Sequence, residues 1–264
     1  MLKVLFIYTL LFKSLYGSNN VEWIACDRCH SHNDYLNKPP LLNAFNYGFK
    51  SIEVDIVLDN NKLYVAHYWW TKKKNVLIQN TYLDTLFKIF NNNDGFIYGG
   101  DKPLILLVDI KSSPNETYEV LNNLLNDYKP MLSHMAKDSF VQGAVTIILS
   151  GNRPVIKYLE RSRERYVFID GRLADLGKSI SRNMMPIISI DWKKEFRWKG
   201  HKDFPRKEKE HLLTLIKKVH SEGKMIRFWG SPDNTRSWKL LYSNDVDLIN
   251  TDKVFELYNF IIQQ

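Results

Sequence analysis

Cysteine is scarce in this sequence of 264 residues, which contains only Cys26 and Cys29. A framework of several disulfides is therefore excluded, and the fold has to depend on its apolar core. The two cysteines lie in a strand-like segment and do not open a helix, which argues against a redox pair. Because residues three apart on a strand face opposite ways, we expect the cysteines to pack separately and not to form a disulfide.

Several other features are missing. The sequence has no internal repeat, no Pro/Gly/Ser-rich linker and no glycine-rich phosphate-binding loop, so one large domain is expected. It has no zinc-finger, RNP or basic-zipper motif, and we expect no nucleic-acid partner and a monomer. Apolar residues make up 44% of the chain, which excludes wholesale disorder. The net charge of +8 suits anionic substrates or surfaces without identifying one.

Residues 1–17 have the pattern of an export signal. Lys3 supplies the positive end, residues 4–12 are apolar, and small residues at 17–18 offer a cleavage site. Lys13 interrupts the apolar segment well before the ~20 residues that a membrane-spanning helix needs. We therefore predict a signal peptide at 1–17, a mature domain at 18–264, and a secreted or periplasmic protein. The alternative is a first core strand or an uncleaved anchor.

Short β-rich runs alternate with helical patterns along the rest of the chain. We expect strands at 24–29, 51–57, 104–110, 144–149, 166–170, 187–190, 225–228 and 247–250. Helices are expected at 40–47, 82–90, 114–128, 154–160, 207–220, 234–242 and 253–262, and a hairpin-like excursion at 62–66. This alternation predicts an α/β fold, a single-domain (β/α)8 TIM barrel. An open doubly wound sheet is the competing fold, and it would need a glycine-rich loop that is missing here.

The second predicted strand carries an unusual pair of acidic residues. Glu53 and Asp55 project from the same face of an otherwise apolar run, because side chains alternate along a strand. Two carboxylates in a buried strand repel one another and lose hydration unless a cation or a proton lies between them. A hard divalent cation, which prefers oxygen ligands, would fit. The alternative is that arginine or lysine pairs with these carboxylates near the sheet end.

Polar residues also follow the other predicted strands, at the ends where barrel active sites lie. The first strand end has His30 and His32, and the third has Asp109 and Lys111, which share a face. The later strand ends carry Asn152, Arg153, Asp170, Arg172, Asp191, Trp192, Trp229, Asn250 and Asp252. The sequence therefore predicts a site on the first three strands, with His30 behind His32.

An ordered set of motifs resembles the phospholipase C-like phosphodiesterase superfamily. The motifs are HNDY at 32–35, GFKSIEVD at 48–55, LYVAH at 63–67 and LVDIK at 107–111, and the likeness continues through 150–154, 170–172, 227–233 and 246–252. That superfamily includes glycerophosphodiester phosphodiesterases, phosphatidylinositol-specific phospholipases C and sphingomyelinase D. The motifs are most similar to a branch with exported bacterial proteins and a fungal mitochondrial-inheritance protein.

The resemblance implies a site and a reaction. Glu53, Asp55 and Asp109 would bind one Mg²⁺ or Ca²⁺. His32 and His67 would act as acid and base or as nucleophile, and Lys111 would stabilise phosphate charge. Phosphodiester cleavage requires charge neutralisation, removal of one proton and donation of another, and two imidazoles can divide the proton transfers.

The expected function is thus that of a metal-dependent phosphoric diester hydrolase, or a cyclising lyase, acting on a phospholipid or a glycerophosphodiester. A non-catalytic barrel that binds a phospholipid headgroup or a cell-surface ligand is one alternative. A metal-independent phospholipase C is another, and the acidic trio argues against it.

The sequence departs from many glycerophosphodiesterases in three places. Asn33 and Asp34 replace Arg-Gly, aromatic residues at 68–70 follow His67 where those enzymes have Asp, and Asp109 stands where they often have Glu. These departures bear on the glycerol-specific substrate and not on the metal chemistry. Segment 192–198 mixes aromatic residues with cations, which would allow peripheral contact with a membrane surface.

Overall fold

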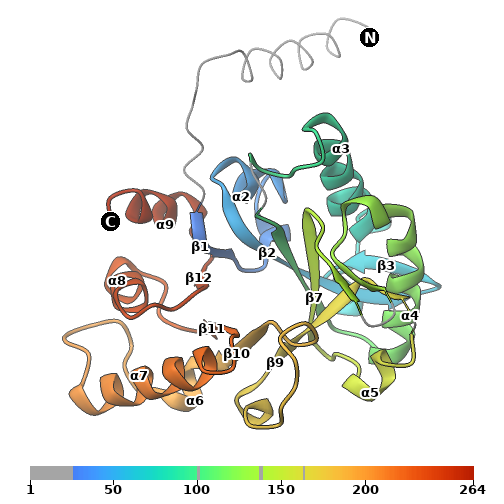
Figure 1. Ribbon diagram of the computed structural model, residues 1–264. Helices are drawn as coiled ribbons and strands as arrows, with labels where there is room; N and C mark the ends of the chain where they lie inside the picture. Colours follow the sequence, from blue (N-terminus) through green and yellow to red (C-terminus); the bar gives the residue numbers. More distant parts are fainter. Residues whose placement is uncertain (1–25, 100–101, 137–138, 163) are drawn as a thin grey trace, which may run out of the picture.

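The computed structural model describes residues 26–264 except 100–101, 137–138 and 163 (Figure 1). The predicted signal peptide at 1–17 and the first two residues of the predicted first strand lie outside the described residues. Among the described helices, none combines the length and the apolar character that crossing a bilayer requires.

Eight parallel strands form a nearly closed barrel (Figure 1). They are β1 (Cys26–Ser31), β2 (Phe49–Asp59), β4 (Leu104–Ile110), β7 (Val145–Gly151), β9 (Val167–Gly171), β10 (Ile187–Asp191), β11 (Met225–Trp229) and β12 (Ile249–Thr251). Their order is β11-β10-β9-β7-β4-β2-β1-β12, and an isolated parallel bridge between Arg227 and Leu248 brings the two ends of this path together. The predicted TIM barrel is confirmed, and the open sheet is wrong.

Helices follow most of the barrel strands; β9 is followed only by a short turn, and the last helix comes after β12. They are α2 (Leu42–Asn46), α3 (Asp84–Asn92), α4 (Pro114–Leu125), α5 (Ile156–Leu159), α6 (Trp192–Glu195), α7 (Arg206–His220), α8 (Thr235–Ser243) and α9 (Val254–Ile261). In α4, Pro114 occupies the first helical position, and Tyr118, Leu121 and Leu125 bury one face. Each predicted helical segment overlaps one of these helices, and α6 was not predicted.

Short elements complete the fold. The hairpin strand β3 (Lys62–Val65) runs antiparallel to β2, as predicted. The short 3-10 segments are η1 (Asp34–Leu36), η2 (Trp69–Thr71), η4 (Asn126–Met131) and η5 (Leu173–Asp175), and η3 (Gln79–Leu83) is a π-helical turn. A small antiparallel sheet of β5 (His134–Ala136), β6 (Ser139–Val141) and β8 (Glu164–Arg165) was not predicted, because strands of two or three residues are too short to show a periodic pattern.

The barrel interior explains where the acidic residues lie. Ile105 and Leu107 of β4 belong to a buried apolar cluster with residues of β7, β9 and β10. Asp109 follows them with the same strand parity, so the inward-facing row of β4 ends in a carboxylate. The register pairs Asp55 of β2 with Asp109 of β4, so the two acidic residues lie at the same level of the barrel.

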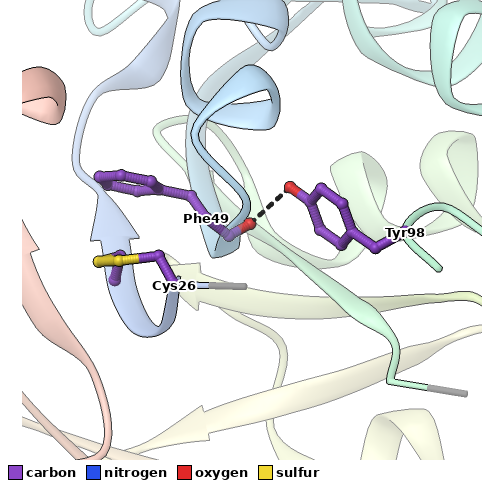
Figure 2. The surroundings of a disulfide bond; sticks show 4 residues. Cys26, Phe49 and Tyr98 are labelled. Atoms are coloured by element: carbon purple, nitrogen blue, oxygen red, sulfur yellow. Dashed lines mark hydrogen bonds between the residues drawn. A yellow bond between two sulfur atoms is a disulfide. The ribbon is translucent and has the colours of Figure 1, made fainter. Parts of the chain in front are cut away.

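The two cysteines form a disulfide, which contradicts the expectation that they pack separately (Figure 2). The strict alternation behind that expectation fails here, because the β1–β2 register shifts between Cys26 and His30. The Cα atoms of Cys26 and Cys29 are consequently 5.3 Å apart. Figure 2 shows this end of β1 beside Phe49, whose carbonyl accepts a hydrogen bond of 2.8 Å from the Tyr98 hydroxyl.

Segment 192–198 does not present its aromatic residues to a membrane. Trp192, Phe196 and Trp198 are buried, and the ring of Trp192 packs against Phe228 of β11. The lysines of the same segment are exposed, so the mixed composition reflects a short element with one inner and one outer face. The aromatic side chains of this segment therefore belong to the core and are not placed for contact with a membrane surface.

Candidate functional site

Three carboxylates converge at the mouth of the barrel. Glu53 and Asp55 come from β2 and Asp109 from β4, and one oxygen from each lies within 4.8 Å of the others. Glu53 and Asp55 are buried and Asp109 is half-buried. Three acidic groups this close, and largely withdrawn from water, repel one another unless positive charge lies among them.

The oxygens themselves test whether a cation fits. Within the described part of the chain, Oδ1 of Asp55 and Oδ1 of Asp109 are buried and have no hydrogen-bond partner. Buried carboxylate oxygens without donors are unfavourable, and a set of hard oxygen ligands suits Mg²⁺ or Ca²⁺. Gly151 of β7 provides the room, because a Cβ at this position would overlap Asp109 Oδ1. The residues present therefore fit a divalent cation.

Arg227 and His30 hold the other side of Glu53. The Arg227 guanidinium donates to Glu53 Oε2 over 2.6 Å, and His30 Nε2 donates to the same oxygen over 2.9 Å. Burial opposes ionisation of Glu53, but Arg227 and His30 outweigh it and hold the pKa of Glu53 well below its usual range. Burial, reinforced by Arg227, lowers the pKa of His30 to about 4, so this ring is neutral near pH 7. Basic pairing, the alternative left open from the sequence, thus describes Oε2 of Glu53, and a lysine also lies 3.5 Å from Asp55 Oδ1.

Two further histidines flank the carboxylates. His67 Nδ1 donates to Asp55 Oδ2 over 2.6 Å, and His32 Nδ1 donates to Asp252 Oδ1 over 2.8 Å. His32 Nε2 lies 3.8 Å from Glu53 Oε1. Burial lowers the pKa of His32, but the hydrogen bond to Asp252 and the charge of Glu53 exceed this effect and raise it overall. Because a carboxylate binds Nδ1 of each ring, Nε2 is the ring nitrogen that could exchange a proton with a ligand.

Lys111 supplies a cation within the cluster. Its ammonium is 3.0 Å from Asp109 Oδ2 and 3.5 Å from Asp55 Oδ1. Burial raises the pKa of Asp109 to about 6; Lys111 opposes this shift, and the neighbouring carboxylates add to it. Burial lowers the pKa of Lys111, but the charges of Asp109 and Asp55 together have the larger effect and raise the pKa overall. The amine therefore stays charged. The Tyr35 hydroxyl donates to Asp55 Oδ2 over 2.9 Å.

The structure brings together all six residues predicted for the site: His32, Glu53, Asp55, His67, Asp109 and Lys111. His30 lies behind them, as predicted. Arg227, Tyr35 and the partnership of Asp252 with His32 were missed. Arg227 and Asp252 lie in sequence motifs that resemble the phosphodiesterase superfamily, and those motifs were the signal that could have placed them in the site.

Other polar strand ends form a separate network. Asp170 accepts hydrogen bonds from Ser150 and Arg172. Arg153 donates to the carbonyl of Asp170 and pairs with Asp175. Both guanidinium groups thus bind protein carboxylates and carbonyls on the β7–β9 side of the mouth, and neither contributes a described contact to the three converging carboxylates.

Curated relatives match most of the chain. The "Altered inheritance of mitochondria protein 6" of Eremothecium gossypii is 28% identical, over 88% of this chain and 69% of that protein. The Saccharomyces cerevisiae protein of the same name is 27% identical over 86% and 68%, respectively. A homologue from Arthroderma benhamiae is 26% identical over 85% of this chain and 81% of that protein.

Solved structures share the fold. A glycerophosphodiester phosphodiesterase from Parabacteroides distasonis superposes with a TM-score of 0.54 at 13% identity, covering 89% of this chain and 97% of that chain. A phosphodiesterase from Oleispira antarctica, solved with the product sn-glycerol-3-phosphate, gives 0.53 at 12% identity, over 89% and 96%. At these identities the likeness concerns the fold alone.

A family assignment agrees with this barrel and its acidic mouth. Residues 19–170 match the AIM6-like phosphodiesterase domain. The match includes β1, β2, β4 and β7, and with them every residue predicted for the site. The chain therefore belongs to the AIM6-like phosphodiesterase domain family.

Proposed function

We propose that this protein is a phosphodiesterase that uses Mg²⁺ or Ca²⁺ and acts on a phospholipid or a glycerophosphodiester. The observation that supports the proposal best is the convergence of Glu53, Asp55 and Asp109 between two anchored imidazoles. A cation held by these carboxylates would neutralise a phosphate oxygen and make phosphorus more electrophilic.

The chain's own residues would perform the proton transfers. One of His32 and His67 would take the proton of the attacking hydroxyl, and the other would give a proton to the leaving oxygen as its bond to phosphorus breaks. Asp252 and Asp55 would hold the two rings in place through Nδ1. Lys111 would add positive charge near the phosphate. Attack by water gives hydrolysis, and attack by a neighbouring substrate hydroxyl gives a cyclic phosphodiester.

Phosphorus NMR of the purified protein with mixed glycerophosphodiesters and phospholipids tests this proposal. We expect product signals with Mg²⁺ or Ca²⁺, none with a chelator, and none from His32→Ala or His67→Ala. His211→Ala is the matched control, because the His211 and His67 side chains are both 43% exposed and both pair with a carboxylate. It should leave turnover unchanged.

Two outcomes would overturn the proposal. Cation binding by calorimetry without any turnover would favour the non-catalytic barrel. Undiminished turnover in chelator would favour a metal-independent phospholipase.

We also propose that the protein is exported as a monomer with residues 1–17 removed and 18–264 retained. The pattern of Lys3, the apolar run and the small residues at 17–18 supports export and cleavage. N-terminal sequencing of the exported fraction, together with its mass in solution, tests it. An intact first methionine in that fraction would contradict cleavage.

A further inference from the structure

Three consecutive aromatic side chains are exposed beside the site. Tyr68, Trp69 and Trp70 are 48%, 64% and 65% exposed. Large aromatic groups gain little by facing water, and a cluster of them on a surface is typical of an interaction site. These residues follow His67 directly, so the cluster adjoins the candidate catalytic pair.

The cluster is ordered by its own contacts. The rings of Tyr68 and Trp70 stack with centroids 4.6 Å apart, and Trp69 meets Trp70 edge-on at 6.2 Å. The Thr71 hydroxyl and amide both donate to the Tyr68 carbonyl, over 2.8 and 3.0 Å, and close the η2 turn. The ring of Tyr68 also contacts His67 edge-on at 4.4 Å. The aromatic side chains are therefore held outward by a defined turn.

Three lysines continue the same segment. Lys72 pairs with Asp59 over 2.7 Å, and its ammonium lies 5.6 Å from the centre of the Trp69 ring. Lys73 and Lys74 are exposed. Tryptophan and tyrosine favour the headgroup level of a bilayer, and lysines beside them are attracted by anionic lipids. We call residues 68–74 the aromatic–lysine rim.

We propose that the aromatic–lysine rim docks the protein on the surface of an anionic phospholipid bilayer. Trp69 and Trp70 would enter the headgroup region, and Lys73 and Lys74 would face anionic lipids. Docking in this way would turn the barrel mouth toward lipid phosphodiesters, so the inference builds on the proposed function and names a membrane as its partner. Complementary charge favours this occupant over a protein. Lys73 and Lys74 are exposed, and the whole sequence carries a positive net charge of +8, which stays positive without Lys3 and Lys13.

Sedimentation with vesicles of phosphatidylcholine, alone or mixed with phosphatidylserine, tests the rim. The full-length chain is used in chelator, so that turnover plays no part and failure of the proposed enzyme activity would leave this result unaffected. We expect the wild type to prefer the anionic vesicles. Lys73→Glu/Lys74→Glu should weaken that binding by about tenfold or more, since each lysine contributes roughly a fivefold factor.

Lys217→Glu/Lys218→Glu is the matched control, because it makes the same charge change at two exposed neighbouring lysines of α7. It should keep at least most of the affinity for anionic vesicles. Equal losses of affinity for anionic vesicles in the two double variants would contradict docking through the rim and indicate a general charge effect. Wild-type protein that shows no preference for anionic vesicles would overturn it as well.

Quenching of tryptophan fluorescence by brominated phospholipids gives a second readout. Trp69 and Trp70 would be quenched on docking, whereas Trp192, Trp198 and Trp238 are buried in the protein. Trp229 is 40% exposed and is present in the wild type and in the variant alike, so its contribution cancels in the comparison. We therefore expect quenching in the wild type and a clearly smaller quenched fraction in Trp69→Phe/Trp70→Phe. Every variant carries the same residues 1–25, so any contribution of that segment is common to all. Quenching that persists unchanged in the double variant would exclude rim insertion.

Discussion

Arg227 reaches from β11 across the mouth to Glu53 on β2, and its Nε also donates to Asn250 of β12 over 2.8 Å. Both partners of the ion pair are buried. A buried carboxylate that loses its cation keeps its desolvation cost without compensation. The pairing thus decides whether the fold tolerates Glu53.

Replacing Arg227 by methionine should therefore lower the free energy of unfolding by about 3–5 kcal/mol. Urea unfolding followed by circular dichroism measures the change. Arg206→Met is the control, since Arg206 pairs with Glu210 on the exposed face of α7 and is 92% exposed. A loss in Arg227→Met no larger than in this control would show that Glu53 does not depend on the arginine.

Gly151 gives a second prediction. It has φ +64°, and a Cβ there would overlap Asp109 Oδ1 and approach the Ile110 carbonyl. Gly151→Ala should displace the Asp109 carboxylate and weaken cation binding roughly 10- to 100-fold, as changes behind metal ligands do. Titration calorimetry with Mg²⁺ and Ca²⁺ measures it.

Gly177→Ala is the control, because it introduces the backbone strain of an alanine at positive φ without an overlap with a neighbouring atom. Gly177 has φ +84°, but a Cβ there would meet nothing within 4 Å. The control should therefore be strained yet bind the cation normally. If both alanine variants bind equally well, Asp109 is not a ligand.

The sequence was sufficient to predict the residues that lie on one strand or on neighbouring strands. Strand parity places Glu53 beside Asp55, and Asp109 follows from the same rule on β4. Arg227 was not predictable in this way, because its contact with Glu53 joins strands 174 residues apart and depends on how the barrel closes. Hydrophobic periodicity carries no information about such a pairing.

At the scale of elements, the loop after β1 depends on one buried carboxyl group. Asp34 of η1 accepts hydrogen bonds from the Leu41 amide over 2.6 Å and from the Tyr82 hydroxyl over 3.0 Å. It thereby ties η1 to the start of α2 and to η3. Burial raises the pKa of Asp34 above its ordinary value of 3.8, although these hydrogen bonds act in the opposite direction.

The raised pKa means that the folded chain binds this proton more tightly than the unfolded chain. The stability it contributes is full below pH 3.8 and is lost as pH rises through the folded-state pKa. We expect the stability advantage of the wild type over Asp34→Asn to shrink over that range, measured by urea unfolding at a series of pH values. Asp203→Asn, at an exposed loop position, should follow the wild type at each pH. Parallel pH profiles of wild type and Asp34→Asn would contradict the assignment.

Long buried strands and helices with clear ends were predictable as elements. β4 consists of apolar residues up to Asp109, and α4 opens with Pro114. The sheet of β5, β6 and β8 and the Cys26–Cys29 disulfide were not, because both depend on departures from regular periodicity. The aromatic segment at 192–198 showed its composition in the sequence but not its orientation.

At the scale of the whole molecule, the acidic cluster predicts that folding and cation binding are linked. The folded barrel assembles three carboxylates that the unfolded chain leaves apart, so we expect a cation bound by them to stabilise the folded state. At a concentration of 100 times the Kd, the gain should be about 2.7 kcal/mol. Unfolding with Mg²⁺ or Ca²⁺, compared with KCl of equal ionic strength, measures it.

Asp109→Asn should raise the stability of the protein without a cation and reduce the stability gained when a cation is added. Without a cation the variant should be more stable than the wild type, because one of three repelling charges is gone. The increase in the free energy of unfolding on adding the cation should be smaller than in the wild type. A cation-dependent gain equal to that of the wild type would exclude Asp109 from the site.

The seam of the barrel lies between β11 and β12, where Arg227 and Leu248 form an isolated bridge. The Arg227 side chain spans that seam to Asn250 and continues to the carboxylate that would hold the cation. A single guanidinium thus connects the two strands at the seam and also neutralises a buried carboxylate at the barrel mouth. Any redesign that swaps this residue to retune the chemistry would also loosen the wall, so the two properties have to be engineered together.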